Sequence, residues 1–220
     1  MARLLLLLSA TLVAIAGACR AAVQRPPTGA TAAQAGASPA VRANADSGTP
    51  PYTVADVRFM TGMIDHHAQA VLIGGWAPSH GASGPVRILC ERIVVAQRDE
   101  IAFMQRWLGE RHQNAPPPAE PQVGMPGVHH PTLMPGMLTA AQLAQLDSAR
   151  GPEFDRLFLT YMIQHHQGAI TMVEQLLRVP GAAQDGQVFR FVADVNADQT
   201  TEIDRMTRML DAMPPSEAGP

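Results

Sequence analysis

Two short runs of methionine and histidine, 99 residues apart, are the part of this 220-residue sequence best suited to chemistry. Both have the pattern Met-x-x-His-His, and they supply Met63, His66, His67, Met162, His165 and His166. Imidazole nitrogen binds several transition metals, whereas thioether sulfur favours soft ions such as Cu(I). A Met and a His three or four residues later share one face of a helix, so both can reach one ion. The spacing therefore predicts a Cu(I) or Ag(I) site.

A second motif follows each run and repeats at an offset of 102. It supplies Gln97, Glu100 and Met104 in the first half, and Gln199, Glu202 and Met206 in the second. Carboxylate di-metal bundles place a Glu on each of two helices and Glu-x-x-His on the other two. This chain has the two Glu residues but carries Met in place of the other two carboxylates. We interpret the six residues as further ligands or as groups that orient the histidines.

Other interpretations of these residues stay open. Histidine–glutamate and histidine–glutamine hydrogen bonds could fix the register of a helical bundle without any metal, because buried polar groups need partners. Each Met could also serve in core packing alone. A di-metal oxidase is the less favoured hypothesis, since the carboxylates of such sites are missing. We therefore expect a non-enzymatic protein that binds copper for tolerance, storage or delivery, with a non-metal structural or interaction lipoprotein as the alternative.

The segment between the halves carries its own metal-binding residue types: Met125, His129, His130, Met134 and Met137. Interspersed Pro and Gly oppose a regular helix, so we predict a loop that captures Cu(I) or Ag(I). In the alternative, the last two Met residues pack onto the bundle and the His residues are only solvated. We expect His80 and His112, outside these motifs, to be solvated as well.

Apolar residues recur every three to four positions through both halves, which predicts helices, and no sustained alternation indicates a strand. The predicted helices span 53–77, 85–112, 152–179 and 186–213, with a short helix over 140–149 that Thr139 caps. The duplicated motifs predict an all-α, ferritin-like four-helix bundle over 52–213. It consists of hairpins 52–112 and 139–213 and a long crossover, 113–138, between the second and third helices. Residues 214–220 form a predicted disordered tail.

The N-terminus has the pattern of an export signal. A basic start, an apolar run and small residues predict a signal peptide over 1–18. Cys19 follows in a lipobox-like position, so we expect lipidation there and a periplasmic or cell-envelope lipoprotein, with simple secretion as the alternative. Residues 19–51 are rich in Ala, Pro and Gly and predict a flexible linker. Cys90, on an apolar helix face, is expected to be buried and inert.

The composition limits the classes of binding partner that we expect. The net charge is −3 and no basic patch stands out, so nucleic acid is not expected as a partner. A metal ion and, through the lipid anchor, a membrane are the predicted partners. The sequence does not identify a protein partner.

The paired Phe-x-x-x-Met-Ile-x-His-His and Gln-x-x-Glu-Ile-x-x-Met motifs, with Met-Pro-Gly-Met before the second half, resemble the bacterial domain-of-unknown-function family 305. The resemblance covers roughly residues 52–212. It implies a ferritin-like four-helix fold, and some members of that family bind copper or silver in the periplasm. By match to the motif, it implies metal-binding roles for the six residues of the Met-x-x-His-His runs.

Overall fold

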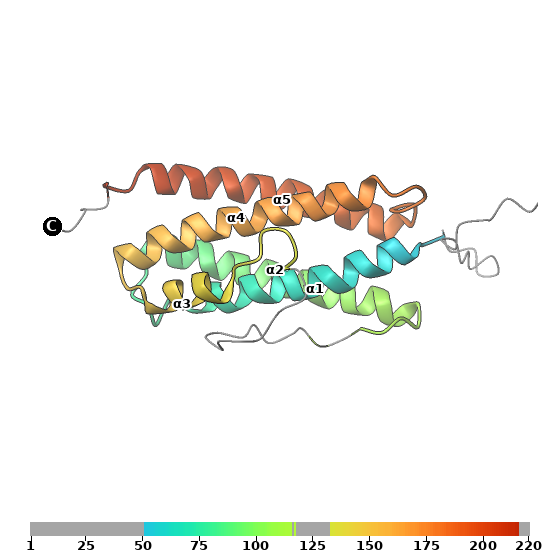
Figure 1. Ribbon diagram of the computed structural model, residues 1–220, viewed down its shortest axis with the longest axis horizontal. Coiled ribbons are helices and arrows are strands. Elements are labelled where there is room, and N and C mark those ends of the chain that lie inside the picture. The colour runs from blue at the N-terminus through green and yellow to red at the C-terminus, as the bar shows by residue number, and fades with distance from the viewer. Residues whose placement is uncertain (1–50, 116, 118–132, 216–220) are drawn as a thin grey trace, which may run out of the picture. The chain divides into compact units, whose positions relative to one another are not determined.

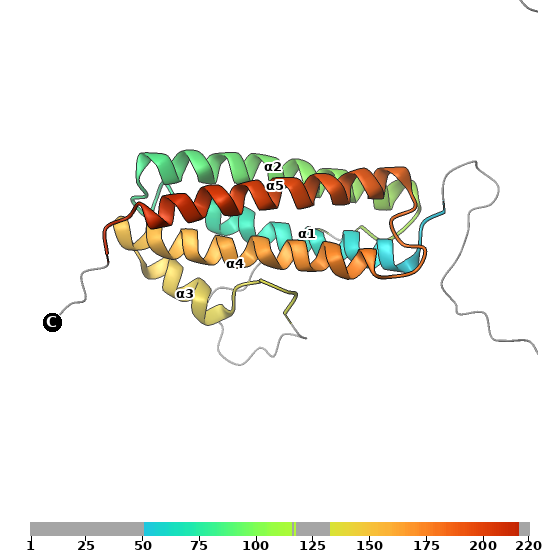
Figure 2. The ribbon, with the colours of Figure 1, turned by 90° about the horizontal axis from the view of Figure 1, so that it is seen from above.

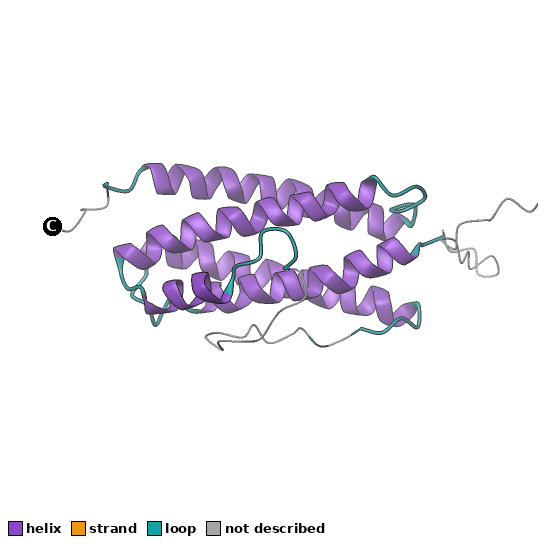
Figure 3. Ribbon diagram, viewed as in Figure 1, coloured by secondary structure: helices purple, strands orange, loops and turns teal. Residues whose placement is uncertain are grey.

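The computed structural model describes residues 51–115, 117 and 133–215, which form helices and, within that part of the chain, no strand (Figures 1 and 3). The helices are α1 (Val54–Gly75), α2 (Gly84–Glu110), α3 (Ala140–Ser148), α4 (Pro152–Leu177) and α5 (Gly186–Asp211). Every helix end lies within two residues of its predicted position. The predicted all-α, ferritin-like four-helix bundle is confirmed, with α3 as the short helix before the second hairpin.

The bundle is built from two antiparallel hairpins. Helix α1 packs along α2, and α4 packs along α5, while α1 and α4 contact each other between the hairpins (Figure 2). Helix α3 lies against α4. Helix α1 is therefore covered by α2 and α4, and α4 by α5, α1 and α3.

Local capping residues explain where helices begin. Thr53 accepts a hydrogen bond from the Asp56 backbone, and the Asp56 carboxylate accepts one from the Thr53 backbone, which makes a capping box. Thr139 and Gln142 form the same arrangement at α3, so the predicted Thr139 cap is confirmed. The Asp56 carboxylate also accepts a 2.8 Å hydrogen bond from the Ala183 backbone, which ties the start of α1 to the loop before α5.

Two apolar clusters fill the bundle, and the predicted histidines lie between them. Along α1, Met63 belongs to one cluster and Ala70 to the other. Along antiparallel α4, Met162 belongs to the second cluster and Ala169 to the first. The chain between these residues carries the His pairs, so a polar layer crosses the middle of an otherwise apolar interior.

Three predictions about single residues outside the repeated motifs have different outcomes. Cys90 is a free thiol at 1% exposure, as expected. His112 is exposed, but the prediction of a solvated His80 is wrong, because that residue is only 5% exposed. Its ring stacks on Trp76, with 5.6 Å between centroids, and its Nε2 donates to the Asp147 backbone carbonyl at 2.9 Å. Helix α3, which ends beside Asp147, covers the turn after α1.

Several predictions fall on residues outside the described part of the chain. They are the signal peptide, the linker, lipidation of Cys19, most of the tail and the loop residues Met125, His129 and His130. Among the helices of the described residues, none has the length and apolarity needed to span a membrane.

Candidate functional site

The four histidines of the repeated runs meet at the centre of the bundle, and all four have 0% exposure. His66 on α1 and His165 on α4 face each other, with their ring centroids 3.9 Å apart and their planes inclined by 36°. Equivalent positions of the two repeats thus lie in contact, as expected for hairpins related by a pseudo-twofold axis.

The other two histidines face across their own hairpins. His67 Nε2 lies 2.6 Å from Glu100 Oε2 on α2, and His166 Nε2 lies 2.6 Å from Glu202 Oε2 on α5. The two contacts are equally short, but only that of His166 also has the angles of a hydrogen bond. The glutamates therefore orient the imidazoles, which is one of the two roles predicted for them.

Adjacent residues of a helix are rotated by about 100° from one another, so the two histidines of each pair point in different directions. Both members of each pair are nevertheless buried. Helix α1 contacts α2 and α4, and helix α4 contacts α5, α1 and α3, so more than one face of each is covered. One face holds the histidine that meets the opposite hairpin, and the other holds the histidine that meets glutamate.

The hydrogen-bond partners fix the tautomers of the central pair. His66 Nε2 donates to the Pro135 backbone carbonyl at 3.0 Å, and His165 Nε2 donates to the His66 backbone carbonyl at 3.0 Å. A carbonyl oxygen only accepts, so the proton is on Nε2 in both rings. A neutral imidazole that donates from Nε2 keeps its lone pair on Nδ1.

Burial keeps these two rings neutral. The pKa of His66 is lowered to about 3, first by burial and next by the nearby His67, whereas the bond to Pro135 opposes the shift. Burial also holds the pKa of His165 well below its usual value, with His66 as the next cause. Both Nδ1 atoms therefore present free lone pairs at neutral pH, the form in which imidazole binds metal.

All four Nδ1 atoms are buried without a hydrogen-bond partner among the described residues. An unsatisfied buried polar atom costs about 1–3 kcal/mol, so four in one layer are unusual for a purely structural core. Coordination to a metal ion is one way to satisfy such atoms. Within the described part of the chain, no three His, Cys, Asp or Glu side chains already surround one point as a ligand set.

Sulfur is available next to this layer. Each of four methionines of the repeated motifs has 0% exposure: Met63, Met104, Met162 and Met206. Gln97 and Gln199 are 2% exposed, and within the described residues both amide atoms of Gln97 and Oε1 of Gln199 lack a partner. The predicted glutamines are thus buried, but not through hydrogen bonds to histidine.

The glutamates also form the more polar edge of the site. The side chains of Glu100 and Glu202 are 18% and 22% exposed, so each reaches from a buried histidine toward solvent. Burial, followed by the charges of these two glutamates, raises the pKa of Asp198. The negative charges of α2 and α5 are therefore close enough to act on one carboxyl, which gives this edge of the bundle an attraction for cations.

Residues 134–138, which we call the strap, cross over α1 and α4 and complete the site (the yellow loop in Figure 1). Gln69 on α1 makes two hydrogen bonds to the Leu138 backbone: its Oε1 accepts from the N–H at 2.7 Å, and its Nε2 donates to the carbonyl at 3.1 Å. On α4, Gln164 donates to the Gly136 carbonyl at 3.2 Å. Gly168 allows the closest approach, since a Cβ there would lie 2.0 Å from the Pro135 oxygen.

Sequence reasoning missed the strap and the three residues that hold it. A signal exists, because position 69 of the first repeat corresponds to position 168 of the second, and one carries Gln where the other carries Gly. Of the predicted capture loop, Met134 packs against the apolar core and Met137 is half-buried, as in the alternative interpretation.

Solved structures with this fold include copper-bound proteins. A DUF305 fragment from Deinococcus radiodurans is 30% identical, with a TM-score of 0.61 over 74% of this chain and 100% of that one. A DUF305 protein from Streptomyces coelicolor, provisionally described as secreted, is 24% identical, with a TM-score of 0.60 over 71% and 92%. CopM in its Cu(II)-bound form is 25% identical, with a TM-score of 0.55 over 71% and 95%.

CopM has also been solved in Cu(I)-bound and silver-bound forms, which match at 23% and 22% identity. No curated protein sequence matches the chain. The sequence profile of DUF305, a domain of unknown function, matches residues 56–210, which is most of the chain and nearly all of its described helices. The chain belongs to the DUF305 family.

Proposed function

We propose that this chain is an exported copper-binding protein that holds Cu(I), and equally Ag(I), in the histidine–methionine layer of the bundle. The ligands are drawn from the six residues of the repeated runs: Met63, His66, His67, Met162, His165 and His166. Copper tolerance, storage or delivery outside the cytoplasm is the corresponding role.

The observation that carries the proposal is the set of four buried Nδ1 atoms without partners among the described residues. In a core that serves only packing, each of these atoms would lower the free energy of unfolding by about 1–3 kcal/mol, and no interaction would compensate for that loss. Hydrogen bonds at Nε2 hold the rings in the tautomer that directs the Nδ1 lone pair away from those bonds. A metal ion between rings accepts such lone pairs.

The identity of the ion follows from the donor chemistry. Neutral imidazole and thioether together favour Cu(I) over harder divalent ions, which prefer carboxylate oxygen. The fully buried Met63 and Met162 supply thioether at the helical spacing that lets Met and His reach one ion. CopM, which shares the fold, binds copper and silver, and this supports the same class of ion here.

Export and anchoring form the second half of the proposal. They rest on the predicted signal peptide and on the lipobox-like position of Cys19. The fold is shared with a protein provisionally described as secreted, which supports export of this chain. We propose a periplasmic or cell-envelope lipoprotein and a binding role without catalysis.

The alternative function is a structural or interaction lipoprotein that binds no metal. The contacts of His67 with Glu100 and of His166 with Glu202 favour it, because such pairs alone could fix the bundle register. It leaves the four Nδ1 atoms unexplained. A titration of the purified protein separates the two functions, because this alternative predicts no copper binding.

The decisive variant is Met63→Leu combined with Met162→Leu, which keeps volume and apolarity while removing both thioethers. Met63 and Met162 lie in the apolar clusters on either side of the histidines, so an ion bound next to one of them loses one thioether. In a competition titration with a coloured Cu(I) chelator, we therefore expect Cu(I) affinity to fall roughly tenfold. Zn(II) affinity should change little. Met60→Leu is the matched control, since Met60 is equally buried on α1 but lies outside the motif. Unchanged Cu(I) affinity in the double variant would refute the role of these thioethers.

A further inference from the structure

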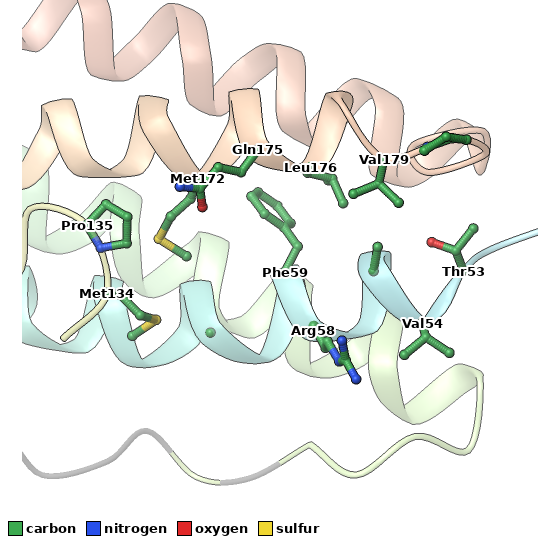
Figure 4. Close-up of a pocket in the computed structure, with 13 residues that line it drawn as sticks. Thr53, Val54, Arg58, Phe59, Met134, Pro135, Met172, Gln175, Leu176 and Val179 are labelled. Carbon is green, nitrogen blue, oxygen red and sulfur yellow. The ribbon is translucent and has the colours of Figure 1, made fainter. Parts of the chain in front are cut away.

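We propose that Met134 on the strap and Met172 on α4 form a second, outward-facing site for a soft monovalent cation, Cu(I) or Ag(I). The site lies outside the histidine layer, in a pocket between α1, α4 and the strap (Figure 4). It rests on the proposed function only in the choice of ion, because its residues are different from those of the buried layer.

The ends of the Met134 and Met172 side chains approach the same point of α1. Measured from the position that a Cβ would take at Gly62, Met134 Sδ lies at 3.1 Å and the Met172 methyl carbon at 3.7 Å. Both side chains line a pocket with a volume of about 550 Å³, and Figure 4 shows them at its strap end, on opposite sides. An ion entering from solvent would meet both sulfur-bearing side chains at this end.

The strap fixes Met134 in this position. Gln69 holds the Leu138 backbone with two hydrogen bonds, and Gly168 lets the Pro135 carbonyl approach α4 more closely than any residue with a side chain would allow. Gly62 leaves the space that the Met134 sulfur occupies. Because backbone contacts already hold the strap, little ordering is needed before both thioethers can act together.

The surroundings suit a soft, singly charged ion. Apart from the thioethers, the pocket is lined mainly by apolar side chains. Gln175 is one of its polar residues, and Thr53 is another, whose hydroxyl is committed to the cap of α1. Arg58 also lines the pocket, and its positive charge opposes a divalent ion more strongly than a monovalent one. Two neutral sulfurs bind Cu(I) or Ag(I) without needing a compensating negative charge.

The position of Met134 and Met172 suggests that an ion is exchanged there between solvent and the bundle. Two thioethers leave coordination positions of Cu(I) open to an incoming donor. Pro135, the residue after Met134, accepts the hydrogen bond that sets the tautomer of His66 in the buried layer. The outer pair and the inner layer are therefore joined through one residue of the strap, and an ion held by the pair is poised between solvent and the bundle.

The test uses protein with ¹³C-labelled methionine methyl groups, titrated with silver nitrate in chloride-free buffer and followed by NMR and native mass spectrometry. We expect the Met134 and Met172 methyl signals to shift together. Met134→Leu and Met172→Leu should each abolish the shift of the other signal and weaken one Ag(I)-binding event roughly tenfold. Met209→Leu is the matched control, since Met209 is half-buried like Met134 but lies on α5. Circular dichroism verifies that each variant is folded.

The outcomes separate this proposal from the function of the buried layer. If the two methyl signals stay unshifted while the wild-type protein binds Ag(I) elsewhere, the second site is refuted and the buried site stands. If the two signals shift together in a His66→Ala, His165→Ala variant as well, the second site is independent of the buried one and the proposal is supported. Shifts of either signal that persist after removal of the other sulfur would refute a shared site.

Discussion

Gly168 is the residue of α4 on which the strap presses, and its replacement by Ala is the sharpest test of this arrangement. A Cβ at this position would lie 2.0 Å from the Pro135 oxygen and 2.5 Å from the Gly136 Cα. Both are backbone atoms, which cannot move aside as a side chain would. We therefore expect Gly168→Ala to displace the strap by on the order of 1 Å, the distance needed to restore normal van der Waals separation.

The size of the effect follows from the contacts that this displacement breaks. The strap would lose the 3.0 Å bond from His66 to Pro135 and the 3.2 Å bond from Gln164 to Gly136. Each is worth about 1 kcal/mol, and a buried His66 Nε2 left without an acceptor adds about 1–3 kcal/mol. Alanine returns about 1 kcal/mol through its higher helix propensity. The net expectation is a loss of about 2–4 kcal/mol of unfolding free energy.

Urea unfolding followed by circular dichroism measures this loss. With a slope of about 2 kcal/mol/M, the midpoint should fall by about 1–2 M. Gly109→Ala on α2 is the matched control, because nothing lies within 4 Å of its added Cβ. That variant should be unchanged or more stable by up to about 1 kcal/mol. If Gly168→Ala is as stable as Gly109→Ala, the close packing of the strap on α4 is refuted.

Two further predictions concern protonation and access. His66 has a pKa of about 3 in the folded protein and about 6.5 unfolded, so the unfolded state binds the proton first and stability falls as pH drops below 6.5. In metal-free protein, protonation of this group alone lowers the free energy of unfolding by about 3 kcal/mol at pH 4. A His66→Gln variant, unfolded in urea at pH 7 and at pH 4, should lose that part of the pH dependence. An unaltered pH dependence would contradict the neutral, buried ring. Cys90 is 1% exposed, and burial, aided by Asp155, raises its pKa to about 12. In a Cys19→Ser background a thiol reagent at pH 8 should therefore label it only after unfolding, and labelling of the folded protein at the unfolded rate would refute that burial.

The repeat predicted the fold well because it combines two independent signals. Helical periodicity predicted each helix, and the matched motifs indicated which parts of the two hairpins correspond to each other in the bundle. In antiparallel hairpins, equivalent residues of two repeats lie at the same depth, so the repeat indicates that the histidine pairs lie at one level, whereas only the structure shows that His66 faces His165. The contacts of Glu100 and Glu202 with histidine agree with this shared level.

The features that the sequence did not predict depend on contacts between distant segments. A single helix does not indicate how many neighbours cover it, so the burial of His67 and His166 was missed. His80 looked like a loop residue because nothing near it in sequence indicates that α3 covers the turn. Met172, one of the two outer thioethers, lies outside every repeated motif and resembles an ordinary core residue until the strap is placed.

The strap also makes the two halves of a duplicated site unequal. A single crossover joins the repeats, so only one half can receive its backbone. His66 donates to the strap carbonyl of Pro135, whereas its counterpart His165 donates to the carbonyl of His66 in α1. Moving the strap therefore frees one ring and leaves the other held by its helix. Two nearly identical motifs thus acquire different roles: His165 is fixed by the bundle, and His66 responds to the segment that carries the outer thioether.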